Sequence, residues 1–411
     1  MQRLANGLKD LGIGKGDVVG IFLPMISEVV VAMLACARIG APHNVVFGGF
    51  SPDSVRERMK VSAAKALITV DGSRRKGRTT AVKREVDRVT ADLEELQTIV
   101  VVRHTGADCA MRDGRDVFYD DLLARSAPEC PAEPLPAEHP LFILYSSGST
   151  AKPKGIVHTT GGYLTGVAAT HRDVFDIKPD SDVFWCTADV GWVTGHSYIV
   201  YGPLANGATS VMFEGAPDYP DKDVWWEIVE RYRVTFLYTA PTAIRACIRW
   251  GDEYSNRHDL SSLRLLGSVG EPINPKAWLW YHAVIGGGRC PIVDTWWQTE
   301  TGHIMIAPLP GLTPTTPGSA TLPLPGVSAA LVDPDGSELA EGTGLLVITR
   351  PWPGMARTLY ADPERFVSTY FSRFGPRTYV VGDAARRDSD GYPSVLRHLQ
   401  ETIGDRQTPP G

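Results

Sequence analysis

The stretch YSSGSTAKPKG, residues 145–155, follows the apolar run LFIL at 141–144 and decides how the chain folds. It holds four Ser or Thr residues, two glycines and two lysines. The apolar run predicts a buried strand, and a hydroxyl- and Gly-rich turn after a strand offers N–H and O–H donors to phosphate oxygens. Its spacing is not that of the common Gly-x-x-x-x-Gly-Lys nucleotide loop. A solvated polar loop is the alternative that such a run favours when taken alone.

Predicted strands and helices alternate on both sides of this loop. Before it, we expect strands at 17–23, 66–70 and 98–102 and a helix at 27–39. After it, we expect strands at 182–186, 209–213, 234–238, 263–268 and 290–294, and helices at 161–170, 224–232 and 242–250. This alternation predicts an α/β fold with two subdomains whose sheets are mostly parallel. Residues 305–350 are dense in Pro and Gly, and their short strands at 327–333 and 344–349 predict a small β-rich, barrel-like subdomain.

These patterns predict four segments along the chain. The first α/β subdomain, with a polar connecting segment, spans 1–139, and the second, with the Gly-rich motifs, spans 140–325. The β-rich subdomain spans 326–392, and residues 393–411 form a tail of different character.

The composition excludes several classes of protein. Charged residues make up 21% and hydrophobic residues 43% of the 411 residues, and the net charge of −6 gives no general attraction to nucleic acid or anionic membranes. The longest apolar stretch, 18–41, is broken by Pro24 and Glu28, so it predicts a strand and a buried helix and no membrane span. The six cysteines form no Cys-x-x-Cys pair and the first residues are no signal peptide, so we expect reduced thiols in a cytoplasmic protein.

Four further segments place Gly and polar residues directly after a predicted strand, at 185–198, 267–272, 294–302 and 379–383. Ligands of open α/β sheets bind at the carboxyl ends of strands, so these loops are expected to meet at one crevice. In such a crevice Glu300 can help to hold Mg²⁺ between phosphates, and Asp383 can accept hydrogen bonds from ribose hydroxyls. Gly270 lets the backbone approach a flat base.

The loop at 145–155 resembles the phosphate-binding signature of the adenylate-forming enzymes, which include acyl-CoA synthetases, luciferases and adenylation domains. The other four segments resemble the adenine, acyl and ribose motifs of that superfamily, in the same order. The sequences WVTGHS at 192–197 and DTWWQTE at 294–300 resemble those of the AMP-forming acetyl-CoA synthetases. The resemblance extends from about residue 5 to residue 392, and five ordered motifs are much harder to match by chance than one.

The resemblance implies a role for each matching position. ATP and AMP are bound by Ser146, Ser147, Gly148, Ser149, Thr150, Lys152 and Lys154 at the phosphates, and by Gly270, Glu271, Pro272, Asp294, Thr295, Trp296, Trp297, Gln298, Thr299 and Asp383 at the adenosine. The catalytic residues are Thr150, Lys154 and Glu300, of which Glu300 ligates Mg²⁺. The acyl pocket is lined by Val193, Thr194, Val269 and Trp297, and CoA is contacted by Arg74, Arg75, Arg78, Thr194 and Asp218.

The implied activity is acetate–CoA ligation with acetate, ATP and CoA as substrates. Acetate attacks the α-phosphorus of ATP to give acetyl-AMP and pyrophosphate, and the CoA thiol then attacks the acyl carbon as AMP leaves. The protein aligns the substrates and neutralises phosphate charge. Trp297 leaves room for a methyl group, but excluding one methylene is worth only about 1–3 kcal/mol, so propionate–CoA ligation stays open. A non-catalytic fragment that binds ATP or AMP is the other alternative.

Three places depart from the family pattern. Ala151 stands where the family carries Gly, at a cost of about 1 kcal/mol if that position needs a positive φ. Asp218 replaces an Asn near CoA and adds negative charge. The resemblance implies that the chain begins inside the family's first domain and is without the mobile C-terminal domain that carries a catalytic lysine. The residues after Gly391-Tyr392 resemble nothing in the family. We therefore expect weak binding of ATP and poor turnover.

Several of these residues can also be explained by a structural role that involves no ligand. Trp296 and Trp297 form a core aromatic pair if composition alone is considered, and His196 is favoured as a polar residue that fixes its loop. The basic loop at 74–78 is either a solvated loop or a contact for the 3′-phosphate of CoA. The charged segment 83–95 predicts a solvated helix face.

Overall fold

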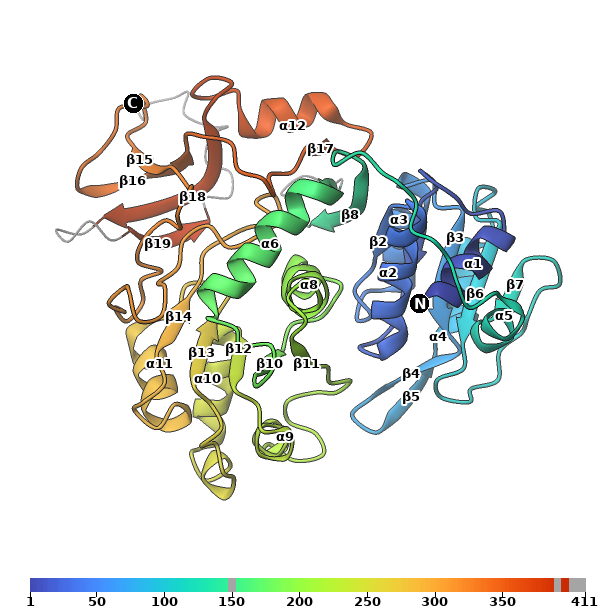
Figure 1. Ribbon diagram of the computed structural model, residues 1–411, viewed down its shortest axis with the longest axis horizontal. Helices are drawn as coiled ribbons and strands as arrows, with labels where there is room; N and C mark the ends of the chain where they lie inside the picture. The colour runs from blue at the N-terminus through green and yellow to red at the C-terminus, as the bar shows by residue number, and fades with distance from the viewer. Residues whose placement is uncertain (147–152, 388–392, 399–411) are drawn as a thin grey trace, which may run out of the picture.

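The computed structural model describes residues 1–146, 153–387 and 393–398, and three main sheets carry the fold in these residues (Figure 1). The first two sheets are mostly parallel and the third is antiparallel, which confirms the predicted α/β class with a β-rich subdomain. The third sheet has a linear strand order, so its described strands form an open sheet and do not close into a barrel.

The largest sheet has the order β17-β9-β8-β2-β1-β3-β6-β7 within the described residues. Strands β8, β2, β1, β3, β6 and β7 run parallel, whereas β9 pairs antiparallel with β8 on one side and with the edge strand β17 on the other. Its strands are β1 (Val19–Ile21), β2 (His43–Val45), β3 (Ala66–Val70), β6 (Thr98–Val102), β7 (Asp116–Phe118), β8 (Pro140–Ser146), β9 (Lys154–Thr159) and β17 (Thr358–Leu359). The helices of this part of the chain are α1 (Gln2–Asp10), α2 (Ser27–Ile39), α3 (Pro52–Val61), α4 (Val82–Thr90) and α5 (Tyr119–Arg125).

The second sheet is wholly parallel, with the order β11-β10-β12-β13-β14. Its strands are β10 (Val183–Cys186), β11 (Thr209–Val211), β12 (Phe236–Thr239), β13 (Leu265–Ser268) and β14 (Ile292–Asp294). The helical segments around it are α6 (Thr160–Val174), α7 (Val193–Gly195), η1 (His196–Tyr201), α8 (Gly202–Ala205), α9 (Val224–Tyr232), α10 (Pro241–Trp250), η2 (Ser255–Arg257), α11 (Pro275–Trp280) and η3 (Tyr281–Ile285). The carboxyl ends of β13 and β14 lead directly into two of the predicted motifs.

The third sheet has the order β15-β16-β18-β19 and joins β15 (Ala329–Val332), β16 (Gly342–Ile348), β18 (Tyr379–Arg387) and β19 (Pro393–His398). Helix α12 (Pro363–Tyr370) precedes β18. Strand β19 pairs with β18 although the sequence assigned residues 393–411 to a separate tail. The pairing depends on backbone hydrogen bonds, which residue type alone does not reveal. Residues 399–411 lie outside the described part of the chain.

Strand β8 joins the first sheet, whereas the sequence placed it at the start of the second α/β unit. His43 of β2 lies opposite Phe142 of β8, and β9 folds back on β8 so that Ser146 faces Lys154. Alternation of helices and strands predicts that a strand exists but does not say which sheet it joins, because that choice depends on contacts distant in the sequence. The loop at 145–155 therefore begins on the first sheet.

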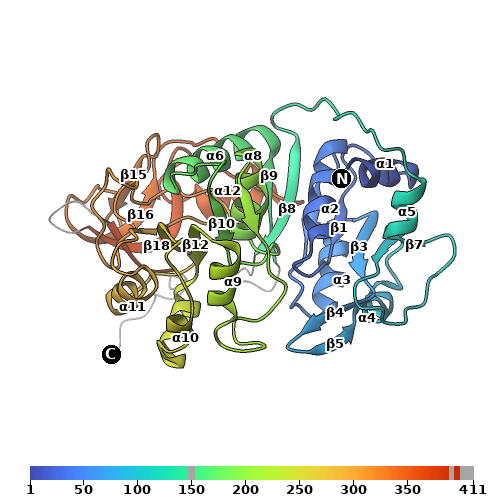
Figure 2. The same cartoon turned by 60° about the horizontal axis from the view of Figure 1, so that its bottom comes forward.

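Two segments contain more regular structure than the sequence suggested. The connecting segment before β8 contains β7 and α5, which add a strand to the sheet edge and a helix beside it. The basic loop is a hairpin of β4 (Gly72–Arg75) and β5 (Arg78–Ala81). Both cartoon views show this hairpin reaching from the first sheet toward the segment before α9 (Figures 1 and 2).

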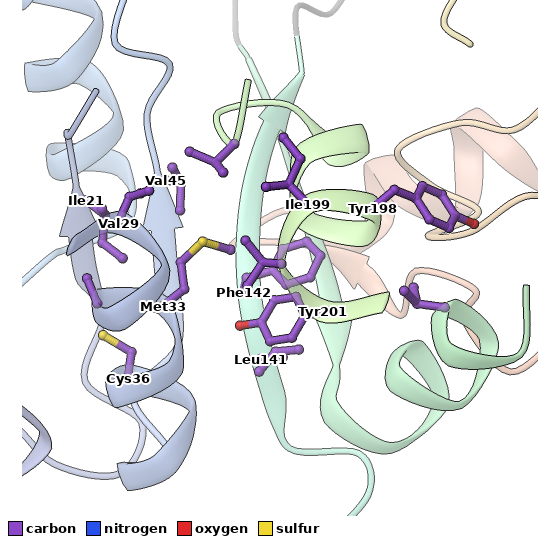
Figure 3. Close-up of a cluster of buried hydrophobic side chains, with 14 of the residues drawn as sticks. Ile21, Val29, Met33, Cys36, Val45, Leu141, Phe142, Tyr198, Ile199 and Tyr201 are labelled. Atoms are coloured by element: carbon purple, nitrogen blue, oxygen red, sulfur yellow. The ribbon is translucent and has the colours of Figure 1, made fainter. Parts of the chain in front are cut away.

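One hydrophobic core joins the first sheet to the helices of the second unit. Figure 3 shows Met33 of α2 reaching toward Phe142 of β8, with Ile199 and Tyr201 of η1 beside it. All four side chains are buried. Because side chains from both units share this core, the loops at the ends of their strands are held in a fixed relation to one another.

The helix α4 does not present only a solvated face, as its charges suggested. Lys83 is completely buried, and its ammonium group donates to Asp87 at 2.7 Å and to Asp116 at 2.8 Å. Arg115 joins the same cluster through Asp87 and Asp116. Such a buried ammonium is tolerated because carboxylates surround it, which residue spacing along one helix cannot show.

Two further expectations concern the whole chain. The six cysteines are free thiols, as predicted, and five of them are buried. Across residues 1–146, 153–387 and 393–398, helices long and apolar enough to cross a bilayer are absent.

Candidate nucleotide-binding site

A cavity of about 240 Å³ lies where the predicted adenosine motifs meet. Most of its wall consists of predicted residues: Gly270, Glu271, Pro272, Asp294, Thr295, Trp296, Trp297, Gln298 and Asp383. The wall also includes three residues that the sequence analysis did not identify: Gly318, Ala320 and Val395. The Pro317-Gly318 pair was the available signal for Gly318, since such a pair marks a turn. Of the predicted adenosine residues, Thr299 alone is not in this wall.

Gly270 follows β13 at the edge of this cavity. Its φ of +92° lies in the region that favours glycine, and an added Cβ would meet nothing within 4 Å. The open space on this side agrees with the prediction that a flat group approaches the backbone at Gly270.

Asp383 is buried, and neighbouring side chains fix its orientation. The indole N–H of Trp296 donates to Asp383 Oδ2 at 2.9 Å, and the Gln298 amide donates to the same oxygen at 3.3 Å. Tyr379 in turn donates to Gln298 Oε1 at 3.1 Å. Trp296 is therefore both a buried core residue and a ligand-cavity residue, so the two readings of the Trp pair are compatible.

Glu271 is anchored at the start of α10. The backbone N–H of Thr242 donates to Glu271 Oε1 at 2.8 Å, the Thr242 hydroxyl donates to the same oxygen, and Arg245 donates to Oε2 at 2.9 Å. Burial raises the pKa of Glu271, but the bonds from Thr242 and Arg245 outweigh it, so the pKa lies below its ordinary value. Glu271 thus carries a negative charge in the cavity wall.

Asp294 at the end of β14 behaves in the opposite way. Burial raises the pKa of its carboxyl to about 7, because little compensates for the loss of water around the charged form. These two of the three acidic residues in the wall therefore differ in charge near pH 6, where Glu271 is ionised and Asp294 is protonated.

The phosphate end of the predicted site begins where β8 and β9 separate. Ser146 and Lys154 are paired across the two strands, and both are partly exposed. The predicted phosphate residues Ser147, Gly148, Ser149, Thr150 and Lys152, together with Ala151, lie outside the described residues. Lys154 and Ser146 thus mark the two ends of the predicted phosphate loop.

Glu300, the predicted magnesium ligand, lies beside Tyr370, the last residue of α12. The Tyr370 hydroxyl donates to Glu300 Oε1 at 2.5 Å and accepts from the Lys154 ammonium at 3.5 Å. The structure thus brings two of the three predicted catalytic residues to one hydroxyl group. The sequence analysis missed Tyr370, and no motif signal marks it, because it is placed by the packing of α12.

The donor set at Glu300 fits a magnesium ion that is shared with a substrate. Among the described residues, no group of three or more His, Cys, Asp or Glu side chains could hold a metal by itself. Mg²⁺ typically takes one or two carboxylates and completes its coordination with substrate phosphates and water. One partly exposed carboxylate near a phosphate loop satisfies that requirement.

Trp297 is held in place by aromatic neighbours. Its N–H donates to the Tyr238 hydroxyl at 3.3 Å, and its ring meets that of Tyr198 edge-on at 5.1 Å. Val193 and Val269 pack against the same hydrophobic core as Trp297. Thr194 is partly exposed beside Val193 at the start of α7. The role of these four residues as an acyl pocket stays a prediction.

A second cavity, of about 230 Å³, lies between the β4–β5 hairpin and the second unit. Arg74 and Arg75 line it, as do Gly48, Gly49 and the carboxylate residue Glu214. Arg78, the third predicted CoA arginine, lies opposite Arg75 in the hairpin but is not in this wall. The hairpin therefore borders a cavity, although the contact with CoA itself stays a prediction.

Asp218 is paired with the hairpin. Its carboxylate accepts from the Lys76 ammonium at 2.6 Å, and this bond holds the pKa of Asp218 below its ordinary value. The extra negative charge that departs from the family pattern is thus balanced by Lys76, which joins the hairpin to the segment before α9.

His196 has the structural role that the sequence analysis favoured. It is fully buried, its Nδ1 lies 3.2 Å from the Trp192 carbonyl oxygen, and its ring lies 4.7 Å from that of Phe142. Burial lowers the pKa of His196 to about 4. A neutral, buried imidazole of this kind has no access to a substrate.

Comparison with known proteins finds relatives along nearly the whole chain. The chain is 60% identical over 404 residues to an acetyl-coenzyme A synthetase of Rubrobacter xylanophilus, covering 98% of this chain and 62% of the relative. It is 57% identical over 407 residues to one of Gemmatimonas aurantiaca, covering 97% of this chain and 62% of the relative. The chain thus spans about 62% of the length of these curated relatives.

A solved structure shares the fold. The acetoacetyl-CoA synthetase from Streptomyces lividans superposes with a TM-score of 0.90 at 30% identity, covering 97% of this chain and 61% of that one. The family model described as AMP-binding enzyme matches residues 1–360. That match covers most of the chain and includes the motifs at 267–272 and 294–302 in the cavity wall, whereas Asp383 lies beyond the matched residues. The chain therefore belongs to the AMP-binding enzyme family.

Proposed function

We propose that this chain carries the substrate site of an AMP-forming acetate–CoA ligase, with ATP, acetate and CoA as substrates. The observation that supports it most is the single cavity walled by the predicted adenosine motifs, with Glu300 two residues beyond Gln298 in its wall. The names of the relatives, acetyl-coenzyme A synthetase, favour acetate. The free cysteines fit a reducing compartment, so we place the protein in the cytoplasm.

In this proposal the adenosine of ATP occupies the 240 Å³ cavity and Asp383 accepts hydrogen bonds from the ribose. Trp296 and Gln298 hold that carboxylate in one orientation, which reduces the entropy lost on binding. Lys154 neutralises phosphate charge at the start of β9. Glu300 would hold a magnesium ion, which would supply charge neutralisation at the phosphates.

The two chemical steps then need alignment more than covalent catalysis. The acetate oxygen attacks the α-phosphorus and pyrophosphate leaves; the CoA thiol later attacks the acyl carbon and AMP leaves. The chain's own contribution is to hold these groups in line and to exclude water from the acyl group, for which the fixed ring of Trp297 is suited. Its firm position favours acetate over propionate by the modest factor that one methylene allows.

The test is a titration of the chain with Mg·ATP and with a non-hydrolysable acetyl-AMP mimic, followed by acetate-dependent exchange of pyrophosphate into ATP. We expect both ligands to bind, and any exchange to be faster with acetate than with propionate. If neither ligand binds, the proposal is wrong; if propionate is preferred, the acyl assignment is wrong and the nucleotide site stands.

Asp218→Asn is expected to strengthen CoA binding by about two- to fivefold. The substitution removes a negative charge beside the second cavity and frees Lys76 for a CoA phosphate, and an exposed ion pair is worth about 0–1 kcal/mol. Calorimetric titration with CoA at low and at physiological salt measures the effect, which should shrink as salt rises.

The matched control for that change is Asp221→Asn. Asp221 belongs to the same segment and loses the same charge, but it pairs with Arg257 at 3.5 Å instead of with the hairpin. It should leave CoA affinity within about twofold. Weaker CoA binding by Asp218→Asn would mean that Asp218 itself contacts the ligand.

A further inference from the structure

The hydroxyl of Tyr370 stands between two groups of opposite charge. It donates to Glu300 Oε1 at 2.5 Å and accepts from Lys154 Nζ at 3.5 Å, while the same ammonium lies 5.3 Å from the centre of the Tyr370 ring. In the part of the chain that the structure describes, no ion pair within 4.0 Å joins Lys154 to Glu300 directly. The Lys154 ammonium and the Glu300 carboxylate are therefore linked by two hydrogen bonds through one neutral hydroxyl.

Packing fixes the position of that hydroxyl. Tyr370 is the last residue of α12, and 5% of its surface is exposed. Its ring stacks on Tyr379 with centroids 5.4 Å apart and planes 17° apart, and it also contacts Phe366 at 5.4 Å. A ring held on two sides cannot move aside easily, so the hydroxyl is a fixed point between Lys154 and Glu300.

The two hydrogen bonds of the phenol have a fixed direction. The Lys154 ammonium can only donate, so the phenol oxygen accepts from it. Its single proton is donated to Glu300, which leaves the phenol oxygen as an acceptor for Lys154. The Tyr370 hydroxyl therefore acts as a donor to the Glu300 carboxylate and as an acceptor from the Lys154 ammonium.

The two charged groups have a direct way to bond if the hydroxyl is removed. Lys154 and Glu300 both lie within hydrogen-bond distance of one atom, so a small side-chain movement would bring the ammonium onto the carboxylate. Such an ion pair would occupy Lys154, which a phosphate needs, and Glu300, which a magnesium ion needs. A ligand would then have to break the pair before it could bind.

We propose that Tyr370 is a positioning residue that keeps Lys154 and Glu300 apart and available for the magnesium–phosphate end of ATP. The inference rests on the proposed function, since it concerns the same site. Tyr370 is not among the residues that line the adenosine cavity, so its hydroxyl should act mainly on the polyphosphate.

The second reading is that the hydroxyl is only a satisfied buried polar group. Buried hydroxyls need hydrogen-bond partners, and Glu300 is such a partner. In that case the loss of the hydroxyl changes stability alone, or it affects all nucleotides equally. The two readings therefore differ in how ATP and AMP respond and in how the effect depends on Lys154.

The test substitutes Tyr370→Phe, which keeps the ring and its stacking. We expect binding of Mg·ATP to weaken by about tenfold, the scale set by one hydrogen bond to a charged group, and AMP binding to stay within about twofold. The magnesium concentration that produces half of the magnesium-dependent gain in ATP affinity should also rise. Calorimetric titrations of the chain with ATP at several magnesium concentrations, and with AMP, provide these values.

Two control variants also remove a tyrosine hydroxyl. Tyr379→Phe removes the bond to Gln298 in the adenosine cavity, so it should weaken ATP and AMP alike and leave the magnesium dependence unchanged. Tyr232→Phe, on the exposed end of α9, should change neither. Comparing the three separates an effect on the polyphosphate from an effect on the nucleoside.

A double substitution makes the outcome decisive. If Tyr370 acts by restraining Lys154, no ammonium remains to pair with Glu300 once Lys154→Gln is made. The double variant should then bind Mg·ATP less than about twofold more weakly than the Lys154→Gln single variant. Full additivity, or equal weakening of ATP and AMP by Tyr370→Phe alone, would overturn the inference. If the unsubstituted chain binds no nucleotide, the proposed function fails first, which is a distinct result.

Discussion

Glu300→Gln is expected to abolish most of the gain in ATP affinity that magnesium provides, weakening Mg·ATP binding by about ten- to a hundredfold. An amide oxygen is a poorer magnesium ligand than a carboxylate oxygen, and the substitution removes the one negative charge that this position offers to the ion. The amide can still accept from Tyr370, so the local packing should persist. Where exchange of pyrophosphate is measurable, its rate should fall by about a hundredfold or more.

The measurement compares ATP and AMP titrations with and without magnesium. Glu271→Gln is the matched control, because it changes a carboxylate in the adenosine cavity that Thr242 and Arg245 hold. Its effect should not depend on magnesium. Unchanged Mg·ATP binding by Glu300→Gln would show that the ion is held elsewhere and would remove Glu300 from the site.

Asp294→Asn is expected to change the pH dependence of folding. In the wild type the folded-state pKa of about 7 lies above the ordinary value of 3.8, so the folded protein keeps a proton that the unfolded chain releases. The stabilisation is fully present below the unfolded pKa and is lost as pH rises through the folded pKa. Relative to Asp294→Asn, the wild type should therefore lose about 1.4 kcal/mol of stability per pH unit near pH 5, and about half of that per pH unit at pH 7.

Urea unfolding of both proteins at half-unit pH steps measures that difference. The difference in stability should shift by about 2 kcal/mol in favour of the variant from pH 5 to pH 7, and should level off above pH 7. Taking the difference cancels the contributions of other groups, such as Asp189, whose pKa burial raises to about 6. Asp173→Asn, an exposed change of the same kind, should give a constant gap. A constant gap for Asp294→Asn would show that its carboxyl is ionised in the folded state.

Much of the candidate site follows from the order of short motifs along the chain. Gly270 and Gln298 were predicted because Gly or polar residues follow an apolar strand, and the parallel sheet brings the ends of β13 and β14 together. Asp383 was predicted by the same rule, yet it lies within β18 of the antiparallel third sheet, which brings it to the cavity from another side. Gly318 and Ala320 were missed because they lie in a Pro- and Gly-rich segment with no strand before them. Val395 was missed because its strand is recognised by its pairing with β18 and not by its residues.

Other features depend on contacts that a linear pattern does not contain. Lys83 was assigned to a solvated helix face, yet Asp116, which is distant in the sequence, gives it a buried partner at 2.8 Å. Asp218 was read as an added negative charge, yet Lys76 from the hairpin neutralises it. Strand β8 was given to the second unit, yet it pairs with β2 of the first.

The sequence by itself determined the α/β class, the five strands of the second sheet, several strands of the other two sheets and the motifs that wall the adenosine cavity, because these depend on local residue pattern and on their order. Only the tertiary structure decided which charges are paired, which sheet carries the phosphate loop and which side chain bridges Lys154 and Glu300. Tyr370 lies 70 residues beyond Glu300 and 216 beyond Lys154, so its role arises from the packing of α12 alone. Charges and strands pair when they lie close together in space. Residues far apart in the chain come close only in the folded protein, so the order of residues alone does not show these pairs.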